Sequence, residues 1–418
     1  MRVSGTVRVP GDKSISHRAL MFAALGDGQS RVSRILNSAD VRSTAGVLRA
    51  MGVGIPELSA DFVVEGRGLR GLQTPSTDLD CGNSGTTARL MSGIVAAQHF
   101  SARLVGDESL SRRPMGRVAR PLAAMGASFE MSAGERLPMT VHGAELEKVE
   151  WDNANSSAQV KSAILLAGAC GGVEAVVREP VPSRDHTERM LAARGAEVWV
   201  NDRTVMLWPV TSLVALDVAV PGDPSSAAFF AALAGLASEG SITLPDVCLN
   251  ATRTGFFFAL ARMGVRLEVD DERTEGGETV GDVVAAPNAL RGIVVEAAEV
   301  PAMIDELPML ACLATRADGE TTVRGASELR VKESDRIAAV VSNLRAVGAD
   351  ADELPDGFVV RGSRTPLRGR VVTHGDHRLA MAFGVLGALP GNEIAVDDPS
   401  CVDVSYPGFW RDLAAVVA

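Results

Sequence analysis

Lysine is rare in this chain, and two of its lysines stand in dense runs of polar residues. Of 41 basic residues only four are lysine: Lys13, Lys148, Lys161 and Lys332. An ammonium is a compact, mobile charge whose pKa changes on burial, whereas a guanidinium is planar and always charged. Lys13 lies within residues 10–18 (PGDKSISHR) and Lys332 within residues 330–336 (RVKESDR). A codon bias toward arginine explains the scarcity of lysine. The dense polar residues around Lys13 and Lys332 nevertheless favour a chemical role for these two.

Carboxylates that could move protons occur at two places. Asp305 and Glu306 interrupt an otherwise apolar segment, where burial would tune the pKa of a general base. The spacing fits equally well a helix that has Asp305 as its N-cap and Glu306 in its first turn. Glu333 follows Lys332, so an ammonium and a carboxylate are available for paired proton transfers. The alternative is an ion-paired helix face that runs from Lys332 to Arg336.

Three expected helices begin with hydroxyl-bearing or small residues directly before an apolar run. Their first residues fall within 14–16, 82–87 and 155–159. The free backbone N–H groups and the helix dipole favour negative charge at such an end. One such start is normally only a cap, but three of them beside isolated cations indicate a shared pocket for anions. The candidate cations are Lys13, Arg18, Arg113, Arg184, Arg336 and Arg378.

A recurring phrase marks the elements that must position these groups. A helical Leu-x-x-x-Gly pattern ends at Gly52, Gly126, Gly195, Gly264 and Gly348, at intervals of 69 to 84 residues. Each glycine predicts the C-terminal end of a helix that leads into a strand. The spacing is too long for a solenoid unit and is typical of a module with its own helices and strands. A sixth, degenerate copy could include the C-terminal residues.

A second repeat divides the chain in half. Residues 9–14 (VPGDKS) recur as residues 220–225 (VPGDPS), 211 positions later, and each copy opens a helix rich in small residues. The alternative is that Pro-Gly-Asp is merely a common turn. Three modules in each half predict two similar domains that close on anionic substrates. Domain I would comprise residues 1–10 and 221–418, and domain II residues 11–220, with hinge crossings near Pro10 and Pro221.

Composition excludes several classes of protein. The net charge of −11 argues against a nucleic-acid or anionic-membrane surface as the main partner. The N-terminus lacks the apolar core of a signal peptide, and no apolar run is long enough to span a bilayer. Five cysteines without a CxxC pair indicate buried thiols in a reducing compartment, so we expect a cytoplasmic protein. Residues 66–71 fit GxGxxG, but no helix is expected after them, and we find no metal-ligand set, Walker loop or nucleophilic triad.

Six motifs together resemble those of the EPSP synthase family, the 3-phosphoshikimate 1-carboxyvinyltransferases of the shikimate pathway. They are residues 11–18, 82–86, 113–116, 157–159, 330–336 and 375–378, in family order along essentially the whole chain. The resemblance implies an α/β (α+β) fold, a two-domain inside-out α/β barrel in which each domain has three βαβαββ repeats. This agrees with the repeat count read from the sequence.

The resemblance also implies a reaction. The family transfers the enolpyruvyl group of phosphoenolpyruvate to the 5-hydroxyl of shikimate 3-phosphate, by addition and elimination through a tetrahedral intermediate, and releases phosphate. We therefore expect these two substrates as partners, with no metal, organic cofactor, nucleic acid or membrane, and we expect a monomer. Positioning and charge stabilisation would then do most of the catalysis.

Residue roles follow from the same resemblance. The shikimate 3-phosphate ligands would be Lys13, Ser14, Arg18, Ser157, Ala158 through its main chain, Gln159, Arg184, Asp305 and Lys332. The phosphoenolpyruvate ligands would be Lys13, Gly85, Arg113, Gln159, Arg336 and Arg378. Asp305 resembles the group that draws the proton from the attacking oxygen. Glu333, with Lys13 or Lys332, resembles the proton donor to the methylene carbon.

The sequence departs from the best-known family pattern at a few positions. Glu328 stands where many members have Asn, Val404 where many have Lys, and Ala158 where many have Ser. We therefore assign no catalytic role to the C-terminal motif around Val404. Gly85 is the position where a larger residue is expected to hinder glyphosate, so we expect a glyphosate-sensitive enzyme.

Two other functions compete with this interpretation. The related UDP-N-acetylglucosamine 1-carboxyvinyltransferases typically have Lys-Asn near the start and a reactive cysteine in a mobile loop. Here Ser14 follows Lys13, and the loop at residues 112–114 has no cysteine. A non-catalytic binding protein on the same scaffold is the other alternative, and the presence of Asp305 and Glu333 argues against it.

Overall fold

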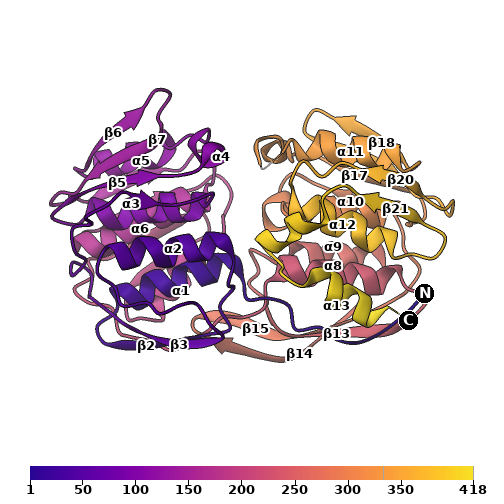
Figure 1. Ribbon diagram of the computed structural model, residues 1–418, viewed down its shortest axis with the longest axis horizontal. Helices are drawn as coiled ribbons and strands as arrows, with labels where there is room; N and C mark the ends of the chain where they lie inside the picture. Colours follow the sequence, from indigo (N-terminus) through magenta and orange to yellow (C-terminus); the bar gives the residue numbers. More distant parts are fainter. Residues whose placement is uncertain (333, 418) are drawn as a thin grey trace. The chain divides into compact units, whose positions relative to one another are not determined.

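Both Pro-Gly-Asp turns are passages of the chain between two compact units. The computed structural model describes residues 1–332 and 334–417 (Figure 1). Unit 1 comprises Met1–Pro10, Pro221–Arg273 and Thr279–Ala418, and unit 2 comprises Gly11–Val220 and Thr274–Glu278. The short stretch Thr274–Glu278, which we had expected in domain I, belongs to unit 2. That Pro10 and Pro221 act as hinges stays a prediction.

Unit 2 contains three sheets around interior helices. The sheets have the strand orders β12-β2-β3, β4-β5-β7-β6 and β10-β11-β9-β8. The strands are β2 (Gln29–Ser33), β3 (Asp61–Glu65), β4 (Leu79–Asp80), β5 (Ser101–Val105), β6 (Ser128–Ser132), β7 (Arg136–His142), β8 (Val149–Asp152), β9 (Ala175–Arg178), β10 (Val198–Asn201), β11 (Thr204–Leu207) and β12 (Val218–Ala219). The helices are α1 (Lys13–Leu25), α2 (Ala39–Ala50), α3 (Gly85–Ala96), α4 (Glu108–Ser111), α5 (Gly116–Ala124), α6 (Ala158–Gly171) and α7 (His186–Ala192).

Unit 1 repeats this design. Its sheets have the orders β1-β13-β15-β14, β16-β17-β19-β18 and β20-β21. The strands are β1 (Arg2–Thr6), β13 (Glu239–Cys248), β14 (Arg266–Glu275), β15 (Glu278–Ala286), β16 (Val294–Val295), β17 (Glu320–Val323), β18 (Asp350–Leu354), β19 (Gly357–Arg361), β20 (Arg368–Val371) and β21 (Glu393–Val396). The helices are α8 (Pro224–Leu236), α9 (Gly255–Met263), α10 (Leu307–Ala314), α11 (Arg336–Ala346), α12 (His377–Gly387) and α13 (Phe409–Val416), with 3-10 turns η1 (Val300–Ala302), η2 (Ser327–Val331) and η3 (Pro399–Val404).

The segment that begins at β8 runs strand, helix, strand, helix, strand, strand. The segments that begin at β4 and β16 follow the same order with additions, the short helix α4 in the first and the 3-10 turns η1 and η2 in the second. In each sheet the first two strands are parallel and the others add antiparallel, as β4, β5, β7 and β6 do. The remaining modules exchange or omit strands. β1 precedes α1 in the chain but pairs with β13 of unit 1, whereas β12 precedes α8 but pairs with β2 of unit 2. This exchange of first strands is the structural reason for both chain passages.

The five recurring glycines end helices as the sequence predicts. Their φ angles are +84° at Gly52, +113° at Gly126, +86° at Gly195, +109° at Gly264 and +91° at Gly348. An L side chain at such a φ is strained, so glycine is the natural residue there. The glycines therefore mark the exits of α2, α5, α7, α9 and α11, each just after the helix's last residues.

The most apolar helices run through the inside of each unit. All eight residues of α10 are buried, and so are most residues of α1, α3, α6, α8 and α12. In Figure 1 the interior helices α3 and α6 lie between the strands β2 and β3 and the strands β5 and β7. Such a helix has no solvent face, so its ends are where it can present polar groups to a ligand.

The cysteines agree with the expectation of buried thiols. All five cysteines are buried. Among the described residues, no helix combines the length and the apolar character that crossing a membrane requires.

Gly264 and Gly348 form a matched pair within unit 1. A Cβ at Gly348 would have no heavy atom within 4 Å, whereas one at Gly264 would collide with the carbonyl oxygen of Ala289. We expect Gly348→Ala to lower the free energy of unfolding by about 1 kcal/mol through backbone strain alone. Gly264→Ala should lower it by about 3 kcal/mol, since the backbone must also shift. Urea unfolding of both variants checks this, and equal losses would contradict it.

Candidate active site

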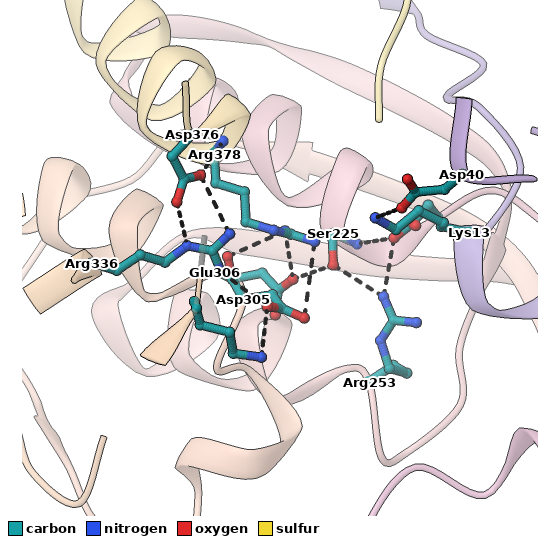
Figure 2. Close-up of polar contacts among 11 residues, drawn as sticks. Lys13, Asp40, Ser225, Arg253, Asp305, Glu306, Arg336, Asp376 and Arg378 are labelled. Atoms are coloured by element: carbon teal, nitrogen blue, oxygen red, sulfur yellow. Dashed lines mark hydrogen bonds and ion pairs between the residues drawn. The ribbon is translucent and has the colours of Figure 1, made fainter. Parts of the chain in front are cut away.

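The start of α1 in unit 2 holds two of the expected cations. Asp12 caps the helix by accepting a bond from the Ile15 N–H (2.8 Å), which leaves Lys13 as the first helical residue. The ammonium of Lys13 lies 3.2 Å from Asp40 (Figure 2). Because Lys13 is only partly buried, this pair leaves it accessible to an anion.

Arg18 is buried on the next turn of α1. Its guanidinium donates to Thr187 Oγ1 (2.8 Å), Ser14 O (3.0 Å) and Ser162 Oγ (2.7 Å). Burial, with a smaller contribution from Arg184, lowers its pKa to about 10, although Glu188 acts in the opposite direction. Arg18 therefore stays charged at neutral pH, and the positive charge of Arg184 acts on it.

The starts of α3 and α6 are joined through Gln159. Its Oε1 accepts a hydrogen bond from Arg89 (2.5 Å), and its Nε2 donates to Thr86 Oγ1 (3.0 Å). A Cβ at Gly85 would lie 3.0 Å from Arg89 Nη1 and 3.6 Å from Arg113 Nη1. Gly85 is therefore the position that leaves room beside these guanidiniums.

Arg89 is a site residue that our sequence analysis missed. It is 6% exposed, and its pKa is lowered to about 9 by burial and by the neighbouring Arg117 and Arg113. Its Nε has no hydrogen-bond partner within the described residues. A charged residue inside the apolar run of α3 was the available signal. Three guanidiniums gathered around Arg89, two of them beside Gly85, are an arrangement that an anion would stabilise.

The start of α6 differs from that of α1. Ser157 is the N-cap residue but makes no side-chain cap bond, whereas Asp12 and Ser84 do cap α1 and α3. The hydroxyl of Ser157 is thus not engaged in capping α6. The first N–H groups of α6, at Ala158 and Gln159, lack that intramolecular acceptor.

In unit 1, Asp305 gathers three cations just before α10. Its carboxylate lies 3.2 Å from Arg336, 3.6 Å from Lys332 and 3.9 Å from Arg378 (Figure 2). Arg336 is 1% exposed and also pairs with Asp376 (2.7 Å). Four residues that we expected to act together (Asp305, Lys332, Arg336 and Arg378) are therefore neighbours.

A second buried cluster joins the start of α8 to the same place. Ser225 Oγ donates to Glu306, which also lies 3.5 Å from Arg378. Arg253 donates to Ser225 Oγ (3.0 Å) and to Asp223 (3.1 Å). Burial raises the pKa of Glu306, and Asp305 raises it further, although Arg378 opposes this. The sequence pointed to Glu306 but gave no signal for Ser225 or Arg253.

Two helical arrangements were the alternatives to the acid–base interpretation: an Asp305 cap and an ion-paired helix face from Lys332 to Arg336. The structure contradicts both. The N-cap of α10 is Glu306, not Asp305, and it makes no side-chain cap bond. α11 begins only at Arg336, so Lys332 does not share its face. Asp335 instead caps α11 and pairs with Arg330 (2.8 Å). The expected proton donor Glu333 lies outside the described residues.

Comparison with known proteins identifies the family. The model of the EPSP synthase family (3-phosphoshikimate 1-carboxyvinyltransferase) matches residues 1–413. The chain belongs to the EPSP synthase family. It is 46% identical to the 3-phosphoshikimate 1-carboxyvinyltransferase of Sulfurihydrogenibium sp. (strain YO3AOP1), over 99% of this chain and 97% of the relative. The corresponding protein of Aquifex aeolicus is also 46% identical, over 100% and 98%.

Solved structures agree with this membership. The EPSP synthase of Acinetobacter baumannii has a TM-score of 0.90 and 38% identity, and the match covers 100% of this chain and 96% of that one. The enolpyruvyl transferase NikO of Streptomyces tendae has a TM-score of 0.76 at 19% identity, with coverage of 99% and 95%, and so shares the fold. The expected family, fold class and enzyme class are thus confirmed, whereas the roles of individual residues stay predictions.

His17, inside the first motif, should make stability depend on pH. It is fully buried, and its Nδ1 lies 2.7 Å from Thr44 Oγ1. Burial lowers its pKa from 6.5 to about 3, so the unfolded chain takes up this proton at a higher pH than the folded one. This contribution to stability is complete above pH 6.5 and is lost as the pH falls, by about 1.4 kcal/mol per pH unit.

We expect His17→Gln to flatten the fall in unfolding free energy between pH 6.5 and pH 5. Urea unfolding of both proteins at several pH values measures the slope. An identical slope in the two proteins would mean that His17 does not titrate differently on unfolding.

Proposed function

We propose that this protein transfers the enolpyruvyl group of phosphoenolpyruvate to the 5-hydroxyl of shikimate 3-phosphate and releases phosphate. Its membership of the family supports the reaction. The observation that carries the proposal is the cluster around Asp305, where one carboxylate sits among an ammonium and two guanidiniums. It offers a general base together with cations for anionic substrates. We further propose that it works as a monomer in the cytoplasm.

The residues at the starts of α1 and α6 would bind shikimate 3-phosphate. Lys13 and Arg18 supply positive charge, while Ser157 and the N–H groups that follow it have no side-chain cap to compete with a phosphate. The full set is Lys13, Ser14, Arg18, Ser157, Ala158, Gln159 and Arg184, completed by Asp305 and Lys332 at the ring hydroxyls.

A second set of cations would hold phosphoenolpyruvate. Arg113 stands beside Gly85, which leaves space for the ligand, and Arg336 and Arg378 flank Asp305. Lys13 and Gln159 complete this set. Arg89 positions Gln159 through its hydrogen bond and adds positive charge. Bidentate guanidiniums suit both the carboxylate and the phosphate of this substrate.

Proton transfers would then accompany each half of the reaction. Asp305 takes the proton of the 5-hydroxyl of shikimate 3-phosphate. The hydroxyl oxygen bonds to C2 of phosphoenolpyruvate, and an acid protonates C3. Glu333, with Lys13 or Lys332, would be that acid. The resulting ketal phosphate then loses a proton from C3. The bond from C2 to the phosphate oxygen breaks, so that phosphate leaves. Fixed charges and positioning provide the stabilisation throughout.

One assay tests the proposal. Purified protein is mixed with phosphoenolpyruvate and either shikimate 3-phosphate or UDP-N-acetylglucosamine, and released phosphate is measured. We expect release only with shikimate 3-phosphate, and inhibition by glyphosate in competition with phosphoenolpyruvate. Release with the sugar nucleotide alone would favour the related transferase, and binding without any release would favour a non-catalytic protein.

The lysines provide a sharper prediction. Lys13→Arg and Lys332→Arg keep the charge but replace a compact ammonium, which faces Asp40 in one case and Asp305 in the other, with a planar group. We expect each to lower kcat/KM by about a hundredfold, because misplacement of a reacting group by 1 Å can have that effect. The exposed Lys148→Arg is the matched control and should be silent. Near-normal turnover in the first two would mean that only charge matters.

A further inference from the structure

A buried carboxylate in unit 2 joins two loops that the reaction has not used so far. Glu179 follows β9 and is 5% exposed. Its Oε1 accepts hydrogen bonds from Asn153 Nδ2 (2.8 Å) and Ser183 Oγ (2.7 Å). Its Oε2 accepts from the Ser183 N–H (3.1 Å) and from Lys161 Nζ (2.9 Å). Both oxygens are therefore fully engaged in holding neighbouring segments.

Lys161 completes this cluster with three acceptors for its three N–H groups. Besides Glu179, its ammonium contacts Glu188 (2.8 Å) and the Ser183 carbonyl (3.2 Å). It is 2% exposed. The two carboxylates raise its pKa and outweigh the opposing effect of burial, so the ammonium stays charged. A planar guanidinium cannot direct single bonds to three acceptors arranged around one nitrogen.

The two loops tied by this cluster are those that carry proposed substrate ligands. Asn153 Nδ2 also donates to the carbonyl of Ser157 (3.0 Å), the residue at which α6 starts. Ser183 directly precedes Arg184. A second tie joins the same loops, because the Val181 N–H donates to Ser156 Oγ (3.1 Å). The carboxylate of Glu179 thus fixes the distance between the start of α6 and the Arg184 loop.

The ionic character of the cluster favours this role over simple packing. Well-packed apolar residues in place of a buried ion pair are often as stable or more stable. Directional bonds from a carboxylate and an ammonium, in contrast, determine where the attached backbone lies. On one side of the cluster, Asn153 donates a hydrogen bond to the Ser157 carbonyl. On the other side, Ser183 directly precedes Arg184. Stability alone does not require charges at this place.

We propose that Glu179 and Lys161 are positioning residues for shikimate 3-phosphate, because they hold the Ser157 and Arg184 loops at the spacing that its binding needs. The inference rests on the proposed function. It does not involve the groups assigned to phosphoenolpyruvate at Gly85 and Arg113. The expected signature is therefore a selective loss of affinity for one of the two substrates.

Asn153→Ala tests this without breaking the ion pairs. It removes the link between Glu179 and the Ser157 carbonyl but leaves Lys161 paired. We expect the KM for shikimate 3-phosphate, and its Kd by calorimetry, to rise about tenfold, the effect of roughly one buried hydrogen bond. The KM for phosphoenolpyruvate should change by less than about twofold, since Gln159, its proposed ligand nearest to this loop, is held separately by Arg89 and Thr86.

Gln98→Ala is the matched control. Gln98 is 1% exposed, and its amide also donates two hydrogen bonds, to Leu69 O (3.0 Å) and Ile94 O (3.3 Å), in the same unit. It should lower the thermal midpoint and leave both KM values unchanged. The inference is overturned if Asn153→Ala leaves the KM for shikimate 3-phosphate unchanged, if it raises both KM values alike, or if Gln98→Ala has the same effect.

A second variant tests the ammonium itself. Lys161→Arg should also raise the Kd for shikimate 3-phosphate at least tenfold in folded protein. An unchanged Kd would overturn the role of Lys161, and if this variant does not fold, Asn153→Ala decides alone. Measurements on the wild-type protein distinguish a failure of the proposed function from a failure of the positioning role. If it neither binds nor converts shikimate 3-phosphate, the proposed function fails; if it does both and the variants behave like it, only the positioning role fails.

Discussion

The structure depends on one constraint: its central helices are buried on all sides, so they can meet a polar ligand only at their ends. The first N–H groups of a buried helix need acceptors, because water is not available to them. Side chains of Asp12, Ser84, Asp223 and Asp376 supply such acceptors at four of the six interior starts. Several of the proposed site residues lie at such starts, because the rest of each interior helix must be apolar.

Asp376 illustrates how capping and chemistry become coupled. One of its oxygens accepts from the Arg378 N–H (3.0 Å) at the start of α12, and the other lies 2.7 Å from Arg336 Nε. Arg336 in turn reaches Asp305 (3.2 Å). A helix cap therefore fixes a buried guanidinium, and that guanidinium fixes the candidate base. Because the charges alternate along this chain of contacts, removal of any member would leave an uncompensated buried charge beside the site.

Local signals in the sequence were sufficient for several helix starts and ends. Pro-Gly-Asp predicted a helix start, and Gly264 a helix end, because capping and positive φ are properties of a few adjacent residues. The repeated Pro-Gly-Asp turn placed residues 1–10 with the second half of the chain, but the pairing of β1 with β13 and of β12 with β2 was not predictable, since strand pairing joins residues far apart in the chain. Arg89 was missed for a similar reason. Its neighbours Gln159 and Arg113 are distant in sequence, and the proximity of Gln159 follows only from the packing of α3 against α6.

The presence of lysine has a physical explanation at three of its four positions. Lys161 had no role from sequence, because α6 gives no sign that it lacks a solvent face. Buried among Glu179, Glu188 and a carbonyl, it needs three bonds from one nitrogen, which a guanidinium does not provide. Lys13 pairs with Asp40 and Lys332 with Asp305, and both ammonium groups are only partly buried. In a chain that otherwise uses arginine for positive charge, lysine is retained where a compact, freely directed ammonium does what a planar fork cannot.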